Sequence, residues 1–316
     1  MKLKMILSLI IVNWNSGGYL KKCLDSIFQN KPHCSFEIII IDNNSNDQSL
    51  RDIKKYYRRI ILVRNTKNVG LSKANNQGIK LSKGKYILFL NPDTKILHNS
   101  LDKMIDYFDK QKNIGALGPK LINPDGSIQT SCHGFVTLSH AFFEMSSLHI
   151  FFPKNRINKF LLGKLLGAVF NNLFASYKAY TKPKKVNVIM GSCFLTSRKV
   201  LNVIGYFDEH FFLYHEENEL CYRMKKHNFE RIYFPYAKVI HYSKQSTSKL
   251  PETVFFERCK SLLYYFKKHY GKKKLLFKFT AIVALMINIP ICLIFNKKKN
   301  DIIKTRLNIL KYLLSN

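Results

Sequence analysis

The stretch YILFLNPDT, residues 86–94, places a carboxylate directly after a run of apolar residues. The apolar part is typical of a buried strand, and Asp93 follows its end. A carboxylate at a strand end can bind Mg²⁺ or Mn²⁺ against a diphosphate, because these hard cations prefer oxygen ligands. Asn-Pro-Asp is also good turn chemistry. Asp93 is therefore a candidate metal ligand, and a structural turn is the alternative.

A second group of acids lies in HEENEL, residues 215–220, within a chain that has only 20 acidic residues. It contains Glu216, Glu217 and Glu219, and three aromatic residues lie just before it. Apolar surroundings raise the pKa of a carboxyl group toward the range of a general base. Acids also favour the first turn of a helix, so a solvated helix start is the alternative.

Three further residues lie just past apolar runs and are candidates for binding. Asp42 ends the run FEIIIID, where it would accept from a nucleobase imide or cap the next turn. Trp14, the only tryptophan, would stack on a base or belong to the core. His241 follows RIYFPYAKVI and would bind a metal or be an ordinary buried histidine.

The elements that must position these residues alternate between strand and helix over the first 120 residues. Four apolar runs predict strands, at 5–12, 36–42, 59–65 and 85–90. The segments between them have apolar residues at helical spacing. This alternation predicts parallel pairing with right-handed crossovers. In such open sheets ligands collect at the carboxyl ends of the strands, where Asp42 and Asp93 lie.

The rest of the chain divides into three parts. Residues 140–180 are apolar and basic without strand alternation, which predicts a helical insert packed over an active site or lying at a membrane interface. Residues 186–248 return to strand and helix signals. Residues 251–316 predict basic, apolar helices. Their apolar run, 279–295, is shorter than the roughly 20 residues of a spanning helix, so a span and an interfacial attachment both stay open.

The formal net charge is +32, which calls for anionic surroundings such as nucleic acid, an acidic membrane or phosphorylated ligands. The chain has no RNP, helix-turn-helix or zinc pattern, so we expect no nucleic acid as partner. Part of the charge reflects a composition rich in lysine throughout. Seven cysteines without a CxxC pair indicate reduced thiols rather than a disulfide framework.

Seven sequence blocks together carry a resemblance to a known family. In order they are LIIVNWNS, IIIIDNNSND, NVGLSKANNQG, FLNPDT, GPKLINPDGS, MGSCFLTSRKVLNVIGYFDEHFFLYHEENELCYR and IHYSKQST. Over about residues 5–248 the chain resembles family 2 glycosyltransferases, most of all the bacterial rhamnosyltransferase-like branch. The resemblance implies the α/β GT-A fold, which is a Rossmann-like nucleotide-diphospho-sugar transferase with a mostly parallel central sheet flanked by helices. We expect the C-terminal helices to add a membrane-associating extension.

The resemblance also implies a domain plan. Residues 1–250 would form the glycosyltransferase domain, with a nucleotide-binding half at about 1–120. The acceptor and catalytic half would follow at 121–250 and contain the helical insert. Residues 251–316 would form the membrane-association region.

Site residues follow from the same resemblance, position by position. Asp42 matches the aspartate that reads the uracil or thymine ring, and Val12 and Trp14 match positions beside that base. Gly70 and Asn76 match the nucleotide-side loop. Asn91 stands where the first aspartate of the family's DxD motif often stands. Asp93 matches the retained metal ligand, and His241 matches a histidine that coordinates the metal in several relatives.

The catalytic residues implied are Glu217 and its neighbour Glu216. Glu217 occupies the position of the catalytic base, where the family usually has aspartate. Glutamate is one methylene longer and moves the carboxylate by about 1 Å, a displacement that can affect catalysis. The implied reaction is an inverting, metal-dependent single displacement with Mg²⁺ or Mn²⁺ as cofactor.

The resemblance and the charge suggest partners and a location. The donor would be a dTDP- or UDP-sugar, carrying rhamnose or a hexose. The acceptor would be a lipid-linked or saccharide precursor of cell-surface polysaccharide or lipopolysaccharide. An anionic membrane surface would hold the enzyme at the cytoplasmic face of the bacterial inner membrane. The alternatives are a non-catalytic relative and a nucleic-acid-binding basic protein.

Overall fold

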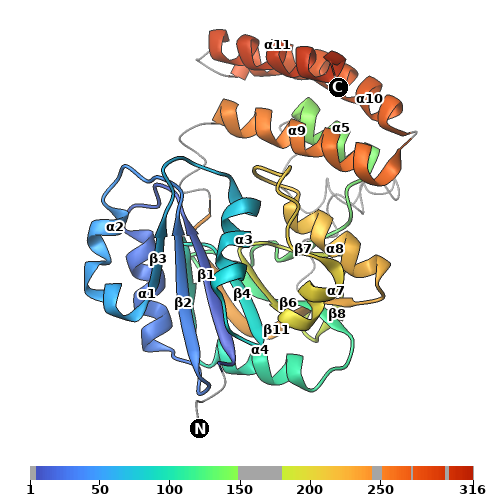
Figure 1. The fold of residues 1–316 in the computed structure, drawn as a ribbon. Helices are drawn as coiled ribbons and strands as arrows, with labels where there is room; N and C mark the ends of the chain where they lie inside the picture. The colour runs from blue at the N-terminus through green and yellow to red at the C-terminus, as the bar shows by residue number, and fades with distance from the viewer. Residues whose placement is uncertain (1–4, 149–179, 244–250, 272, 296–298, 316) are drawn as a thin grey trace. The chain divides into compact units, whose positions relative to one another are not determined.

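A computed structural model describes residues 5–148, 180–243, 251–271, 273–295 and 299–315. The chain forms two compact units (Figure 1). Unit 1 comprises residues 1–133, 177–212 and 216–249, and unit 2 comprises 134–176, 213–215 and 250–316. Most of the expected helical insert at 140–180 lies outside the described residues.

The first half of the sheet in unit 1 is parallel, as the apolar runs predict. β1 (Leu7–Asn13) lies between β2 (Phe36–Asp42) and β4 (Tyr86–Leu90), and β3 (Ile61–Arg64) pairs with the outer edge of β2. β1, β2 and β4 are buried almost throughout, which explains their continuous isoleucine and leucine runs. Their carboxyl ends meet at one edge of the sheet.

The second half of the sheet is mixed, so the expectation of a mostly parallel sheet holds only for the first half. β10 (Cys193–Ser197) is antiparallel to β4 and to β6 (Ile114–Ile122). The chain enters β10 beside the end of β4, where Asn91 N donates to Ser192 O at 2.9 Å, and therefore runs back along it. β11 (Glu230–His241) is parallel to β6, and the sheet order is β3-β2-β1-β4-β10-β6-β11-β5.

A short strand pairs with each end of β11. β5 (Thr94–Ile96) is antiparallel to the end of β11, with Thr94 opposite His241. β8 (Lys184–Lys185) also pairs with β11. A separate two-stranded sheet joins β7 (Cys132–His133) to β9 (Val188–Ile189).

Alternation along the strands sends side chains to helices on both faces of the sheet. On one face Leu9 and Ile40 pack in a core with α1 (Tyr19–Gln29) and α4 (Ser100–Asp109). On the other face Ile39 and Ile41 pack with Ala74 of α3 (Leu71–Leu81). A side chain at Gly78 of α3 would meet Ile10 Cγ2 at 2.5 Å, so glycine is required for this approach.

The remaining helices of unit 1 lie between the strands in sequence. α2 (Ser49–Asp52) and the 3₁₀ helix η1 (Lys54–Arg59) connect β2 to β3. α7 (Arg198–Ile204) follows β10 directly, and Ser197 caps it by accepting from Val200 N. α8 (Glu216–Lys226) precedes β11.

Unit 2 is helical in its described part. It contains α5 (Leu138–Ser146), α9 (Pro251–Tyr270), α10 (Lys273–Phe295) and α11 (Lys299–Ser315). α10 packs against α5, α9 and α11. Residues 275–294 of α10 are long and apolar enough to cross a membrane, judged by length and composition only. The expected C-terminal helices are thus present, and one of them is apolar.

Candidate active site

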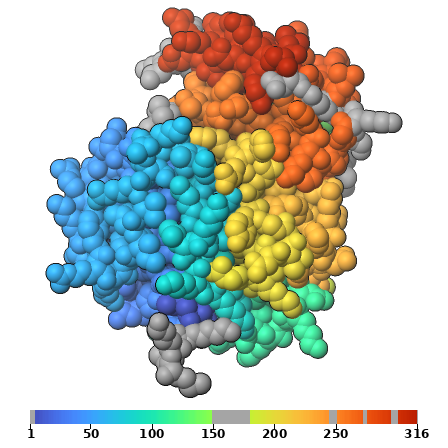
Figure 2. Space-filling model, viewed as in Figure 1, coloured from blue at the N-terminus to red at the C-terminus, as the bar shows by residue number. Residues whose placement is uncertain are grey.

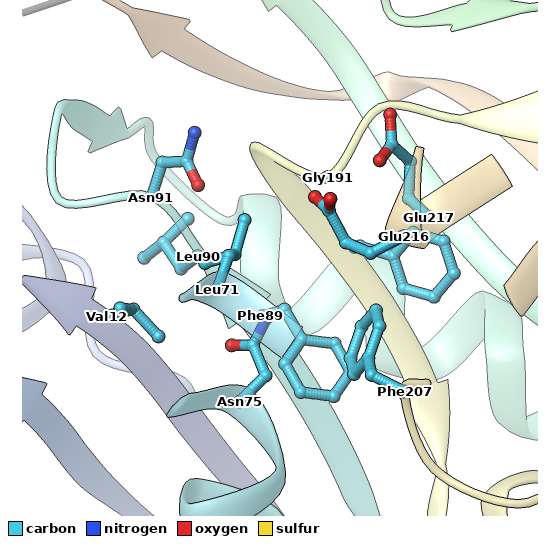
Figure 3. A pocket seen from close by; sticks show the side chains of 11 residues that line it. Val12, Leu71, Asn75, Phe89, Leu90, Asn91, Gly191, Phe207, Glu216 and Glu217 are labelled. Carbon is cyan, nitrogen blue, oxygen red and sulfur yellow. The ribbon is translucent and has the colours of Figure 1, made fainter. Parts of the chain in front are cut away.

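A pocket lies in unit 1 beside the carboxyl ends of β1 and β4 (Figure 3). It encloses about 370 Å³, including the part open to solvent. β1 contributes Val12, Asn91 follows β4, and α8 contributes two glutamates. The full lining is Val12, Leu71, Asn75, Phe89, Leu90, Asn91, Gly191, Phe194, Phe207, Glu216 and Glu217. The pocket is therefore mostly apolar, with polar groups at its two sides.

Glu216 is the more buried of the two glutamates. It is 5% exposed, and its Oε2 has no hydrogen-bond partner in the described part of the chain. Burial raises the pKa of Glu216 well above 4.5, and the adjacent charge of Glu217 raises it further. Burial and the neighbouring charge therefore both favour the protonated form of Glu216.

Glu217 follows at the next position of α8, and its side chain is 14% exposed. Its Oε1 lies 3.9 Å from Nε2 of His133 on β7. The backbone just before the acids is unusual, since Tyr214 and His215 have φ values of 66° and 65°. Such conformations in residues other than glycine are uncommon and are often found at functional sites. The two acids thus start their helix from a tightly constrained turn.

The third acid of HEENEL has a different role. Glu219 is fully buried and accepts three hydrogen bonds from the guanidinium of Arg223, at 2.7–2.9 Å. Arg223 also donates to the carbonyl oxygens of Ile204, Gly205 and Tyr206. The pair ties α8 to the end of α7 and so fixes the helix that carries the two pocket glutamates.

Asp93 and His241 lie together, as the resemblance implies. β5 pairs with the end of β11, and Tyr242 N donates to Asp93 O at 2.9 Å. Asp93 Oδ1 is 3.3 Å from His241 Nε2, and both side chains are about nine-tenths buried. His241 Nδ1 is 2.7 Å from Gln129 Oε1, and the Gln129 amide nitrogen donates to Asn123 Oδ1 at 2.8 Å. Since Gln129 Oε1 only accepts, Nδ1 of His241 carries the proton.

This arrangement fits a divalent cation. His241 Nδ1 donates to Gln129, and its Nε2 lies 3.3 Å from Asp93 Oδ1, so an imidazole nitrogen and a carboxylate oxygen are close enough to share one cation. An imidazole nitrogen fixed through its other N–H and an adjacent carboxylate are common metal ligands. Within the described residues no group of three or more His, Cys, Asp or Glu side chains could hold a metal ion. The protein would therefore supply two ligands, as is usual for ions that also bind substrate phosphates.

The predicted base-reading residue sits in a polar network at the end of β2. Asp42 is 3% exposed, and its Oδ1 accepts from Asn13 Nδ2 at 2.7 Å. Its Oδ2 accepts from Ser45 N at 3.1 Å. Val12, one position before Asn13, lines the pocket. Asp42 itself does not, and half-buried Trp14 is also outside the lining.

The two residues of the predicted nucleotide-side loop are accounted for by packing. Gly70 has φ 85°, and a side chain there would meet the backbone oxygen of Phe212 at 2.8 Å. Asn76 is buried and donates to Phe207 O and Glu209 Oε1, while its own Oδ1 accepts from Phe207 N. Neither residue lines the pocket, whereas the neighbours Leu71 and Asn75 do.

Several residues of the site escaped the sequence analysis. Gln129 and His133 lie in or beside β7, a two-residue strand without a usable pattern. Phe89 and Phe207 contact each other at the floor of the pocket, with ring centroids 4.9 Å apart. Asn75 could have been proposed from the sequence, because it is adjacent to the predicted Asn76.

Two curated relatives of this chain are named as glycosyltransferases. An N-acetylglucosaminyl-diphospho-decaprenol L-rhamnosyltransferase of Mycobacterium tuberculosis (strain ATCC 25618 / H37Rv) is 25% identical over 259 residues, covering 78% of this chain and 79% of the relative. A poly(ribitol-phosphate) beta-glucosyltransferase of Bacillus spizizenii (strain ATCC 23059 / NRRL B-14472 / W23) is 30% identical over 203 residues. That match covers 58% of this chain and 31% of the relative.

Solved structures confirm the fold. A mannosyltransferase from Pyrobaculum calidifontis, in complex with GDP-Man and Mn²⁺, superposes with a TM-score of 0.55 at 11% identity. That match covers 98% of this chain and 86% of the neighbour. GalNAc-T7, solved with UDP, GalNAc and Mn²⁺, gives a TM-score of 0.54 at 20% identity and covers 76% of this chain and 44% of the neighbour. Both are glycosyltransferases, and the GT-A fold expected from the sequence is confirmed.

The family comparison settles the membership. The model of Glycosyl transferase family 2 matches residues 8–205, which run from β1 to the residue that follows α7. The match covers more than half of the chain and contains Asp42, Asn91 and Asp93. The enzyme class expected from the sequence is thereby confirmed, and this chain belongs to glycosyl transferase family 2.

Proposed function

We propose that this chain is an inverting, metal-dependent glycosyltransferase that moves a sugar from a nucleoside diphosphate to a lipid-linked saccharide. The observation that carries the proposal is the pocket. It brings the end of β4, with Asn91, opposite two glutamates at the start of α8 (Figure 3). A nucleotide-sugar bound at the strand ends would thereby present its anomeric carbon toward a carboxylate base.

The proposed reaction is a single displacement at the anomeric carbon. Glu217 takes the proton of an acceptor hydroxyl, and the oxygen forms a bond to the anomeric carbon on the face opposite the diphosphate. The bond from that carbon to the diphosphate oxygen breaks, and the nucleoside diphosphate leaves with the electron pair. Configuration at carbon inverts, because the attack and the departure occur on opposite faces.

Glu216 has a supporting role in this proposal. Its raised pKa favours the protonated form, which donates to the Glu217 carboxylate and leaves that group as the base. Its Oε2 has no protein partner in the described structure, so it is available to a hydroxyl of the substrate. Once a substrate fills the pocket, the apolar lining around both acids would limit the water that reaches the anomeric carbon.

Asp93 and His241 would hold the metal. When bound, Mg²⁺ or Mn²⁺ would supply positive charge to balance the charge that develops on the departing diphosphate. Gln129 keeps the proton of His241 on Nδ1, so that Nε2 stays available as a ligand. Asp42, Val12, Trp14, Gly70 and Asn76 keep their predicted roles on the nucleotide side as part of this proposal.

The acceptor class rests on the relative from Mycobacterium tuberculosis, whose name describes a lipid-linked diphosphate sugar as its acceptor. We extend this acceptor class to the present chain, with rhamnose as the first donor sugar to test and UDP-hexoses next. An enzyme working on such a substrate would act at the cytoplasmic face of the bacterial inner membrane. The net charge of +32 supports attachment to an anionic surface.

A donor screen tests the proposal. The purified chain would be heated with dTDP-rhamnose, UDP-hexoses and GDP-Man, each with and without Mn²⁺, since a ligand of the native state raises the unfolding temperature. We expect one donor to stabilise the chain only when Mn²⁺ is present. That donor would then be incubated with a lipid-diphosphate sugar, and NMR of the product would show the inverted linkage. A retained linkage, or stabilisation by no donor, would contradict the proposal.

A further inference from the structure

Unit 2 has an apolar helix face that nothing covers in the described structure. Four large side chains of α10 are 66–75% exposed: Leu275, Phe279, Met286 and Ile294. They follow one another by four, seven and eight residues, which places them within about 100° of one another around the helix axis. We name these four residues the α10 row.

A second exposed row lies on α11, which packs against α10. Ile303, Leu307 and Leu314 are 40%, 50% and 74% exposed and are spaced by four and seven residues. Lys304 and Lys311 are also exposed on this helix. In the space-filling view α11, in red, lies at the molecular surface (Figure 2). Apolar side chains with lysines beside them are typical of helices that bind at a membrane surface.

The opposite side of α10 is packed within unit 2 and contains a polar network. Asn288 is fully buried, and its Nδ2 donates to Ser147 Oγ at 2.7 Å. Arg306 of α11 is 3% exposed and donates to Asn288 Oδ1 at 2.7 Å. The same guanidinium forms an ion pair with Glu252 of α9. These contacts bind α9, α10 and α11 into one packed body.

This network argues against a membrane-spanning α10. Asn288 lies in the apolar stretch 275–294, so a spanning helix would carry Arg306 and Glu252 into the hydrocarbon with it. Ionised side chains at that depth are costly. A helix in the plane of the membrane surface needs only one apolar face, and the α10 row is such a face.

The positive charge of the C-terminal segment indicates which partner covers the α10 row. Residues 272–316 contain ten Lys and Arg and one acid, Asp301. A second copy of the chain would bring the same positive charge to the contact, which opposes self-association. Anionic lipid headgroups complement it and attract basic segments near the surface.

We propose that α10 lies in the plane of an anionic lipid surface, with the α10 row in contact with the acyl chains and the lysines of α11 at the headgroups. The helix therefore attaches the enzyme to one leaflet and does not cross the bilayer. This inference is independent of the reaction proposed for the pocket in unit 1.

Vesicle binding by the full chain tests the attachment. We expect binding to phosphatidylglycerol vesicles that weakens with salt, and much weaker binding to phosphatidylcholine vesicles. The double variant Phe279→Glu/Met286→Glu should bind at least roughly tenfold more weakly, because two apolar contacts are lost and two like charges meet the headgroups. The control Val203→Glu changes a 51% exposed apolar residue of α7 in unit 1 and should bind like the wild type.

A depth measurement distinguishes the two orientations. Tryptophan would replace Phe279, Met286 or Ile294 in turn, and quenching by lipids brominated at different depths would be measured after subtracting the Trp14 signal. An in-plane helix gives the same shallow depth at all three positions. Deepest quenching at position 286 would show a span and overturn the proposal.

Two controls protect the interpretation. Circular dichroism and nucleotide binding should be unchanged in the double variant, which shows that both units remain folded. Where the double variant does not fold, the three tryptophan variants still decide the orientation. Light scattering without lipid should show a monomer, and a dimer abolished by Phe279→Glu/Met286→Glu would assign the face to a second copy instead.

Discussion

Two buried acids on α8 lie only three residues apart and have opposite surroundings. Glu219 is surrounded by donors, with Arg223 bonding both carboxylate oxygens. Glu216 lines the pocket, has an oxygen without a protein partner in the described structure, and lies beside another carboxyl group. Folding alone favours the first arrangement, because a buried polar group without a partner is costly. The second arrangement is expected where a ligand completes the site.

The same contrast separates two other buried carboxylates. Glu144 of unit 2 lies 2.9 Å from the Arg258 guanidinium and close to two histidines. Despite its burial, these neighbours hold the pKa of Glu144 well below its usual range. Asp93 of unit 1 instead has a single histidine beside it, with its Oδ1 3.3 Å from His241 Nε2 and no arginine or lysine within ion-pair distance in the described structure. Glu144 is thus neutralised by an arginine of the protein, whereas Asp93 has only a histidine beside it, and a bound cation would complete its surroundings.

The largest expected effect comes from Glu217→Gln, which removes the proposed base and keeps its size. We expect the transfer rate to fall about 10²- to 10⁴-fold, the usual contribution of a general base. The affinity for the nucleotide-sugar and the unfolding temperature should change little. Single-turnover rates, with binding measured by calorimetry, check this.

The control for Glu217→Gln is the same substitution at Glu230, which lies on β11 and pairs with Lys185. It should leave the rate within about twofold, as expected for a surface ion pair. Equal activity of Glu217→Gln and Glu230→Gln would contradict the role of Glu217 as the base. Glu217 would then be a structural acid, as Glu219 is.

Much of the first half of the sheet was predictable from sequence. β2 and β4 occur almost where the apolar runs placed them, because strands buried on both faces have a continuous apolar signal. The antiparallel β10 was not predictable, since strand direction depends on where the chain enters the sheet. For β10 that entry is the contact between Asn91 and Ser192, far apart in sequence.

The second expected effect is on stability and comes from Arg223→Met. It leaves the Glu219 carboxylate buried without its partner, which typically costs about 3–5 kcal/mol of folding free energy. Urea unfolding should show this loss, while donor affinity per folded molecule stays unchanged. The double variant Glu219→Gln/Arg223→Met should recover a large part of the loss, because the unpaired charge is gone. Loss of donor affinity with unchanged stability would contradict the assignment of Glu219 to the fold and of Glu216 to the binding site.

A third effect concerns the proposed metal and comes from Gln129→Leu. Without Gln129 Oε1 the proton of His241 is no longer held on Nδ1, so Nε2 is a poorer ligand. The Mn²⁺ concentration for half-maximal activity should rise about 10- to 100-fold, as for other partners of metal ligands. The control is Gln111→Leu, an exposed residue after α4 that should show no change. An unchanged Mn²⁺ requirement in Gln129→Leu would contradict metal binding by Asp93 and His241, and their contact would then only stabilise the fold.

The resemblance named three residues whose roles in the site remain part of the proposal. Asp93, His241 and Glu217 lie in segments with a recognisable order of residues, so sequence alone could name them. Gln129 and His133 join the site only because short strands bring distant segments together, and such pairings leave little sequence signal. The pairing of Glu219 with Arg223 follows an i,i+4 spacing that was visible in the sequence, although its burial was not.

The smallest expected effect is the pH dependence contributed by Glu216. Its pKa in the folded chain is raised above the ordinary 4.5, so the native state holds this proton more tightly than the unfolded state. Its contribution to stability is therefore complete below about 4.5 and is lost as pH rises through the folded-state pKa. Glu216→Gln removes that loss, because an amide does not titrate.

Thermal unfolding at a series of pH values above 4.5 tests this expectation. The unfolding temperature of Glu216→Gln should exceed that of the wild type by an amount that grows with pH. Each kcal/mol of folding free energy that the wild type loses corresponds to a difference of about 2–4 °C. Glu230→Gln should show no such growth. A difference that is constant with pH would mean that Glu216 is ionised in the folded chain over the whole range. It would then be a second charged acid beside Glu217, and the contrast with the arginine-paired Glu219 would rest on geometry alone.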